Sequence, residues 1–279
     1  LTVYDPLSDR LEKLVSLGAT AAADEKAVMQ AADVVFLSMP FPDVLREVVD
    51  SKVMPHVHPG QVLVDLSTTP VAMTRALVRR CAAKGAVWLD APISGGPEGA
   101  EAGALRVFVG GDEATATRLR PLFEVIGESN YVVYCGDSGL GQVTKAVNQL
   151  VMGLVTAGCL EALSYGVRSG VSPEVLMQAI GGDNGCRREF ATVARRVAGG
   201  EGEYVHIKFG QYDEFLEHAR EQGLPTPITD ALHAFCDKGE RRVFELPRHR
   251  RTGRKAPSFW HELQTRTRTE SAEGREGET

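Results

Sequence analysis

Short runs of apolar residues alternate with helical patterns over the first half of the chain. Most of these runs carry hydrophobic side chains on both faces, which is typical of strands covered on both sides of a sheet. Between the runs, apolar residues such as Leu11, Leu14 and Val15 recur at helical spacing. The alternation predicts an α/β domain with a parallel or mostly parallel sheet. The expected strands are residues 2–5, 34–39, 61–67, 86–93 and 104–111, and the expected helices are residues 8–19, 43–54, 69–85 and 112–127.

The pattern changes near Ser138. Residues 141–170 contain no proline and are apolar nearly all round, which predicts one long, buried helix. The segments that follow are helical in pattern, and the last residues are polar and rich in glycine and glutamate. We therefore expect an α/β domain over residues 1–138, an all-helical domain over residues 139–264 built on the long interdomain helix, and a disordered tail over residues 265–279.

Composition and charge narrow the classes of function. The chain has 43% hydrophobic and 24% charged residues and a net charge of −6, so a general nucleic-acid or membrane-surface role is not expected. Apolar runs such as residues 34–41 are too short to span a bilayer. The five cysteines are scattered without CxxC spacing, which suits free thiols in a reducing cytoplasm. His56 and His58 have no third ligand nearby, so we expect no metal site.

Ser94, Gly95 and Gly96 directly follow an expected strand. A hydroxyl and consecutive backbone N–H groups without side chains in the way can form a nest for an anion such as a carboxylate. The alternative is a plain strand-to-helix turn, which needs glycines for positive φ. These three residues alone leave both explanations open.

Lys145 lies in the first turns of the long helix that we expect to be buried. Desolvation lowers the pKa of a lysine and makes it usable as a proton donor. Asn148 and Gln149 follow three and four residues later, so they share the face of the helix that carries Lys145. The alternative is a lysine near a helix start whose ammonium group reaches the surface.

The first expected strand and helix fit the second strand of a dinucleotide-binding Rossmann fold, in which an acidic residue ends that strand about 20 residues after a G-x-G-x-x-G loop. Asp5 fits the acidic position. We therefore expect an N-terminally truncated Rossmann-type sheet, whose glycine loop and central first strand would lie before residue 1. Either the protein continues upstream, or this chain cannot bind the cofactor in the usual way. A carboxylate at Asp5 accepts from both ribose hydroxyls and repels a 2′-phosphate, which favours NAD over NADP.

Four segments together resemble the β-hydroxyacid dehydrogenase family of the 3-hydroxyisobutyrate dehydrogenase and tartronate semialdehyde reductase type. They are "VFLSMP", "VDLST", "DAPISGGPEGAEAGAL" and "GLGQVTKAVNQ", and the resemblance runs from residue 1 to about residue 235. It implies that Lys145 is the general acid in reduction and the general base in oxidation. It also implies that Ser94, Gly95 and Gly96 bind the substrate carboxylate, and that Asn148 or Gln149 orients the substrate.

The resemblance also implies cofactor contacts. Met39 and Pro40 would line the path of the adenosine and pyrophosphate, and Thr68 would approach the nicotinamide. Lys208 resembles the lysine that closes over the cofactor, although the aspartate that follows it in the family is phenylalanine here.

These features predict an NAD(P)-dependent oxidoreductase, of the 2-hydroxy-3-oxopropionate reductase or 3-hydroxyisobutyrate dehydrogenase type, that interconverts a small 3-hydroxy acid and its semialdehyde. We expect a small carboxylate substrate, a cytoplasmic homo-oligomer, and no nucleic-acid or membrane partner. The alternative is a non-catalytic fragment or binding protein that keeps the fold but cannot hold the cofactor. Ser94 and Lys145 favour the enzyme, and the missing glycine loop favours the alternative.

Overall fold

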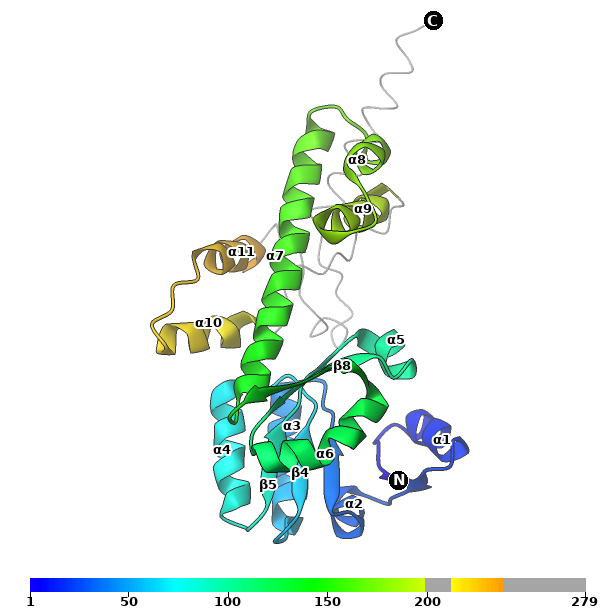
Figure 1. Ribbon diagram of the computed structural model, residues 1–279, viewed down its shortest axis with the longest axis vertical. Coiled ribbons are helices and arrows are strands. Elements are labelled where there is room, and N and C mark those ends of the chain that lie inside the picture. Colours follow the sequence, from blue (N-terminus) through cyan, green and yellow to red (C-terminus); the bar gives the residue numbers. More distant parts are fainter. Residues whose placement is uncertain (199–211, 238–279) are drawn as a thin grey trace, which may run out of the picture. The chain divides into compact units, whose positions relative to one another are not determined.

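The computed structural model describes residues 1–198 and 212–237. The chain divides into two compact units, Leu1–Ala146 and Val147–Thr279. The division falls inside the long helix α7 (Leu140–Arg168), which begins in the first unit and continues in the second (Figure 1).

The first unit alternates strands and helices, as the apolar pattern predicts (Figure 1). Its strands are β1 (Thr2–Val3), β2 (Thr20–Ala21), β3 (Val34–Leu37), β4 (Val62–Asp65), β5 (Val87–Asp90), β6 (Ile93–Ser94), β7 (Leu105–Gly110) and β8 (Gly127–Gly136). Its α-helices before α7 are α1 (Ser8–Ser16), α2 (Glu25–Ala31), α3 (Pro42–Val48), α4 (Val71–Ala82), α5 (Gly96–Glu101) and α6 (Glu113–Ile126), and a π-helix (Val49–Val53) and a 3-10 helix (Met54–His56) follow α3.

The strands form two sheets. β3, β4 and β5 run parallel in sequence order, β7 runs antiparallel to both β5 and β6, and β8 pairs with β7 in parallel. This confirms the expected α/β class with a mostly parallel sheet. β1 and β2 pair with each other in parallel as a separate sheet, and among the described strands no ladder joins β1 to β3. That a further strand would lie between β1 and β3, as in the Rossmann strand order, stays a prediction.

Helices lie on both sides of the central strands (Figure 1). Because successive side chains of a strand point to opposite faces, alternate residues meet different helices. Val62 and Val64 of β4 belong to the core cluster that contains Leu119 of α6. Leu63, between them, belongs to the cluster that contains Leu77 of α4 and residues of α2 and α3. The sheet is therefore buried on both faces, which explains why its strands are continuous apolar runs.

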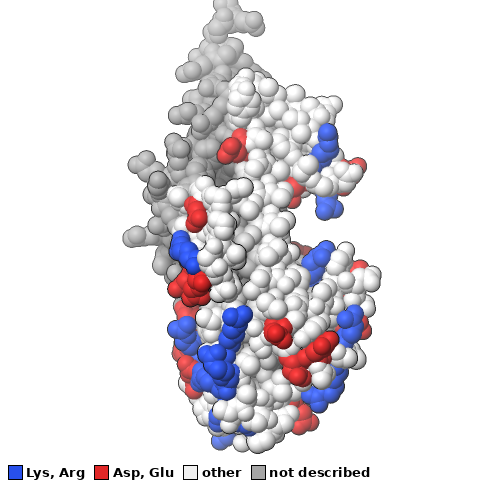
Figure 2. Space-filling model, turned by 60° about the vertical axis from the view of Figure 1, so that its left-hand side comes forward, with Lys and Arg blue, Asp and Glu red and all other residues white. Residues whose placement is uncertain are grey.

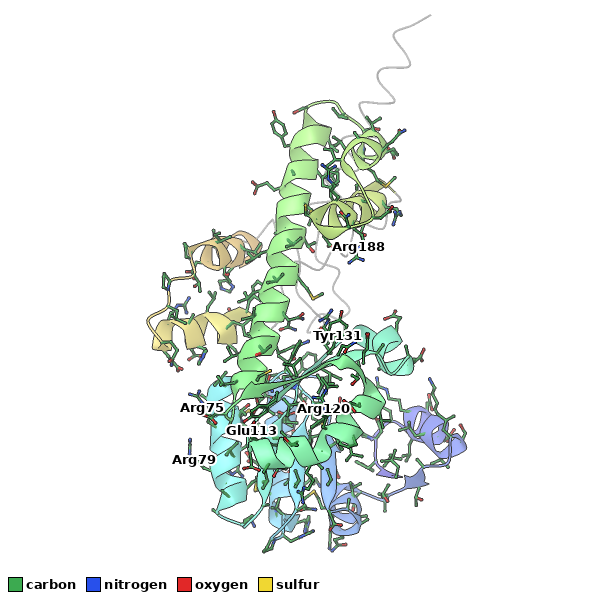
Figure 3. The ribbon with its side chains drawn as sticks, in the orientation of Figure 1. Arg75, Arg79, Glu113, Arg120, Tyr131 and Arg188 are labelled. Carbon is green, nitrogen blue, oxygen red and sulfur yellow. The ribbon has the colours of Figure 1, made fainter. Side chains whose placement is uncertain are left out.

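β8 was not expected from the sequence. The chain leaves α6 at Ile126 and enters β8 directly. Arg120 of α6 joins the two elements, because its guanidinium donates to Glu124 Oε1 at 2.8 Å and to the carbonyls of Ser129 and Val132, both at 3.2 Å (Figure 3).

The second unit contains the rest of α7, followed by α8 (Pro173–Ile180), α9 (Gly185–Ala198), α10 (Tyr212–Glu221) and α11 (Pro227–Asp237). One core cluster joins α7, α9, α10 and α11. Its buried members are Leu160, Leu163, Val167, Phe190, Val193, Ala194, Tyr212 and Leu232.

The expectation that α7 is buried nearly all round is wrong along one face. The side chains of Val147, Val151 and Tyr165 are 54%, 56% and 77% exposed. By length and composition alone, residues 140–167 are apolar enough to cross a membrane, although only 24% of the most apolar window is buried inside the structure. Core helices of soluble proteins also pass this test, so the finding is weak evidence for a membrane span.

Charged side chains of both signs share the surface. Figure 2 shows lysine and arginine side chains near aspartate and glutamate side chains in several patches, with uncharged surface between them. The net charge of the whole chain is −6.

Candidate active site

The start of α7 is fixed to the sheet by Asp90, the last residue of β5. The buried carboxylate of Asp90 accepts hydrogen bonds from the backbone N–H groups of Gly139, at 2.8 Å, and Gln142, at 3.1 Å. Burial raises the pKa of Asp90 above its ordinary value, although these N–H groups oppose the shift. A Cβ at Gly110 would lie 2.7 Å from both Asp90 Oδ2 and Gly141 N, so only glycine permits this close approach.

Lys145 follows five residues after the start of α7. Its side chain is 7% exposed, and its Nζ donates a hydrogen bond of 2.7 Å to the carbonyl oxygen of Ile93 in β6. Burial lowers the pKa of Lys145 to about 8. Of the two explanations for this residue, the structure therefore favours the buried amine, and it places that amine next to the peptide bond between Ile93 and Ser94.

Ser94, Gly95 and Gly96 form the turn between β6 and α5. Gly95 and Gly96 have φ values of +144° and +67°, in the region that favours glycine. A Cβ at Gly95 would also lie 3.0 Å from Leu105 Cδ2. The turn itself therefore requires both glycines, as the plain-turn explanation holds, and carboxylate binding by this segment stays a prediction.

A buried polar network joins the carboxyl ends of β3 and β4 to α7. The carboxylate of Asp65 accepts from Ser67 N at 2.9 Å and from Thr69 Oγ1 at 2.7 Å. Ser67 Oγ in turn accepts from Met39 N at 2.8 Å. The side-chain amide of Gln142 donates to Ser67 O at 2.9 Å and accepts from Thr69 N at 3.0 Å. Burial raises the pKa of Asp65 to about 6, against the opposing effect of its hydrogen bonds.

The structure thus brings some of the expected cofactor residues together and leaves others apart. Met39, Pro40 and Thr68 lie in the loops after β3 and β4, which the network connects. Asp5 follows β1 in the other sheet, where its Oδ1 accepts from Leu7 N at 2.8 Å. Lys208 lies outside the described residues.

Asn148 and Gln149 continue α7 beyond Lys145. Asn148 is half-buried, and its Nδ2 lies 3.5 Å from the sulfur of Met152. Gln149 is 7% exposed, and its Oε1 has no hydrogen-bond partner within the described ranges. A buried amide oxygen without a partner can accept a hydrogen bond from a ligand. The substrate-orienting role of either residue stays a prediction.

Sequence reasoning missed Asp65, Asp90 and Gln142. Each of them is fully or almost fully buried. The two aspartates stand at the ends of apolar strands, and the glutamine stands in an apolar helix. A polar residue in such a position needs a partner, and that signal could have identified all three.

Comparison with known proteins relates this arrangement to a family. A family model described as the NAD binding domain of 6-phosphogluconate dehydrogenase matches residues 1–136. A second, described as NAD-binding of NADP-dependent 3-hydroxyisobutyrate dehydrogenase, matches residues 139–244. The 2-(hydroxymethyl)glutarate dehydrogenase of Eubacterium barkeri is 33% identical over 239 residues, which cover 82% of this chain and 78% of that protein. The chain belongs to the β-hydroxyacid dehydrogenase family. By family it is an NAD(P)-dependent hydroxyacid dehydrogenase that acts on CH–OH groups.

Other relatives match over shorter lengths. The 2-hydroxy-3-oxopropionate reductase of Escherichia coli is 33% identical over 184 residues, which cover 65% of this chain and 61% of that protein. The chain therefore spans less than two thirds of the length of this relative. The solved structure of Mycobacterium tuberculosis 3-hydroxyisobutyrate dehydrogenase has a TM-score of 0.72 at 22% identity and covers 95% of this chain and 89% of that chain. At that identity the likeness supports the fold alone.

Proposed function

We propose that this chain interconverts a small 3-hydroxy acid and its semialdehyde with NAD or NADP, and that Lys145 is the general acid and base. The observation that carries the proposal is the buried amine of Lys145, which lies 2.7 Å from Ile93 O and has its pKa lowered to about 8. An amine whose pKa is near the working pH can both donate and accept a proton.

In this proposal each site residue has one role. During reduction, Lys145 gives a proton to the carbonyl oxygen of the semialdehyde, and during oxidation it takes that proton from the hydroxyl group. Ser94, Gly95 and Gly96 hold the substrate carboxylate, and Asn148 or Gln149 orients the carbon chain. The nicotinamide, when bound, supplies or accepts the hydride.

The described residues fit the nicotinamide end of the cofactor. Thr68 is half-buried, and none of the hydrogen bonds among the described residues engages it, so its polar groups are available to a ligand. Met39 and Pro40 would line the adjoining path, and Asp5 would accept from the ribose hydroxyls. The sequence holds no G-x-G-x-x-G loop for the pyrophosphate. The preference for NAD over NADP rests on the carboxylate of Asp5 and is part of the proposal.

The proposed substrate is a short carboxylate, since the relatives are named for 2-(hydroxymethyl)glutarate, 2-hydroxy-3-oxopropionate and 3-hydroxyisobutyrate. A homo-oligomer is also proposed, because the apolar face of α7 at Val147, Val151 and Val155 is exposed in the single chain. A cytoplasmic location is proposed from the free thiols of Cys81, Cys135, Cys159 and Cys186.

The test combines binding and turnover. NADH and NADPH are titrated into the protein. Initial rates are measured for oxidation of 2-(hydroxymethyl)glutarate and 3-hydroxyisobutyrate and for reduction of 2-hydroxy-3-oxopropionate. Lys145→Ala should lower kcat at least about tenfold, whereas the exposed Lys84→Ala should leave it unchanged. A Lys145→Ala variant that keeps most of the wild-type kcat would show that another group moves the proton.

The second candidate function is a non-catalytic binding protein that keeps the fold and the turn at Ser94–Gly96. It predicts that neither NADH nor NADPH binds, while a small carboxylate still protects the turn at Ser94–Gly96 from hydrogen exchange. The same titration therefore separates the two functions.

A further inference from the structure

The side-chain amide of Gln142 bridges two backbone groups that flank one residue. Its Nε2 donates to Ser67 O at 2.9 Å, and its Oε1 accepts from Thr69 N at 3.0 Å. The orientation of the amide is fixed by chemistry, because a carbonyl can only accept and an N–H can only donate. The side chain is 2% exposed, so water does not compete for these bonds.

This bridge holds the loop at Ser67 and Thr69, on both sides of Thr68, and makes no hydrogen bond to Thr68 itself. The carboxylate of Asp65 holds the same loop by accepting hydrogen bonds from Ser67 N and Thr69 Oγ1. In the described part of the chain, no hydrogen bond engages the backbone or the hydroxyl of Thr68. The loop is therefore held in one conformation and presents Thr68 to a ligand.

The other end of Gln142 belongs to the helix that carries Lys145. Its backbone N–H donates to Asp90 at 3.1 Å, and Lys145 follows three residues later on the same side of α7. One residue thus contacts β5 through its backbone and the loop after β4 through its side chain.

We infer that Gln142 is a positioning residue that holds the Thr68 loop and the Lys145 helix as one rigid body. The inference rests on the proposed function, in which Thr68 contacts the nicotinamide and Lys145 moves the proton. Cofactor and proton donor then keep a fixed separation without Gln142 touching either substrate or cofactor. Small errors in that separation are costly for rate, since reacting atoms must be held within contact distance.

The first test is Gln142→Met, which keeps the length of the side chain and removes both hydrogen bonds. Ser67 O and Thr69 N then lose their partners in a buried place. We expect the Kd for NADH to rise at least about tenfold and kcat to fall. The exposed Gln178→Met on α8 is the matched control and should change neither.

The second test is Gln142→Glu, which should make the affinity for NADH depend on pH in a way that a merely structural role would not. A protonated carboxyl group has one donor and one acceptor and can replace the amide, whereas a carboxylate would face Ser67 O with no proton to donate. The affinity of this variant for NADH, divided by that of the wild type at each pH, should therefore fall as pH rises from 5 to 8. Asp65, Asp90 and Lys145 also titrate near this position, so the trend is compared with that of Gln142→Met, which keeps these three groups and should show no such fall.

The outcomes are distinguishable from those of the proposed function. If the wild type binds neither NADH nor NADPH, the proposed function fails, and the positioning role is judged by hydrogen exchange at the Thr69 amide. Gln142→Met should then exchange that amide at least about tenfold faster than Gln178→Met does. Unchanged exchange, or an unchanged NADH affinity where NADH binds, overturns the inference.

Discussion

Lys145→Met should make the folded chain more resistant to unfolding near neutral pH while it removes activity. The folded environment lowers the pKa of Lys145 from 10.5 to about 8. At about 1.4 kcal/mol for each pH unit, this corresponds to about 3 kcal/mol by which the fold disfavours the charged amine. The sign follows from the direction of the shift. The cost is fully present below pH 8, declines between pH 8 and 10.5, and is absent above that range.

Methionine carries no charge, so the variant lacks this pH-dependent cost. It also loses the hydrogen bond to Ile93 O, which offsets the gain by about 1 kcal/mol at every pH. The free energy of unfolding of Lys145→Met, relative to the wild type, should therefore be about 2 kcal/mol higher at pH 7. It should fall below the wild-type value by about 1 kcal/mol near pH 10.5.

Urea unfolding of both proteins between pH 7 and 10.5 measures this difference. The exposed Lys84→Met is the control, and its difference from the wild type should stay within about 0.5 kcal/mol throughout. A constant offset between wild type and Lys145→Met across the whole range would refute the reasoning, because it would mean that burial does not shift the titration of this amine.

Three further predictions concern the same region. The kcat/KM for reduction should fall above about pH 8 and that for oxidation should fall below it, since Lys145 must be charged in one direction and neutral in the other; a flat profile would exclude it as the proton carrier. Gly141→Ala should lower the free energy of unfolding by at least about 2 kcal/mol, because its Cβ would press against Phe108 O. The control is Gly158→Ala in the same helix, where a Cβ would meet open space, and it should raise the free energy of unfolding by about 0.5–1 kcal/mol. If the two variants change the melting temperature by similar amounts, the close packing at Gly141 is contradicted. The free energy of unfolding of the wild type should fall by about 3 kcal/mol as pH rises from 4 to 6, because the folded protein holds the proton of Asp65 more tightly than the unfolded chain does. Asp65→Asn should not show this fall in urea unfolding. An equal pH dependence in both proteins would contradict the prediction.

Much of the fold could be predicted from the sequence because local pattern and tertiary burial agree there. The apolar runs at β3, β4 and β5 are strands covered on both faces, and α7 begins within one residue of its expected start. The two-residue β2 is too short to give a pattern. β8 contains the polar residues Glu128, Ser129 and Asn130 and follows α6 without a turn, so no local signal separates it from the helix. The exposed face of α7 was missed because an all-round apolar pattern does not identify the face that is covered.

For the candidate site, too, one part could be predicted from the sequence and another could not. Lys145 could be found from sequence because a charge in an apolar helix is conspicuous. The residues that hold it could not be paired, because Asp90 and Gly139 are 49 residues apart and Gln142 and Ser67 are 75 apart. Such contacts depend on which strand ends meet the helix, and that is a property of the whole fold.

The fixed start of α7 bears on how enzymes of this family diversify. Lys145 is held by Ile93, Asp90 and the glycine contacts at Gly110 and Gly141, all within the first compact unit. Mutations from Val147 onward can therefore change the second unit while these contacts of Lys145 stay in place. Under the proposed function, a protein altered only in its second unit would keep the surroundings of its proton donor.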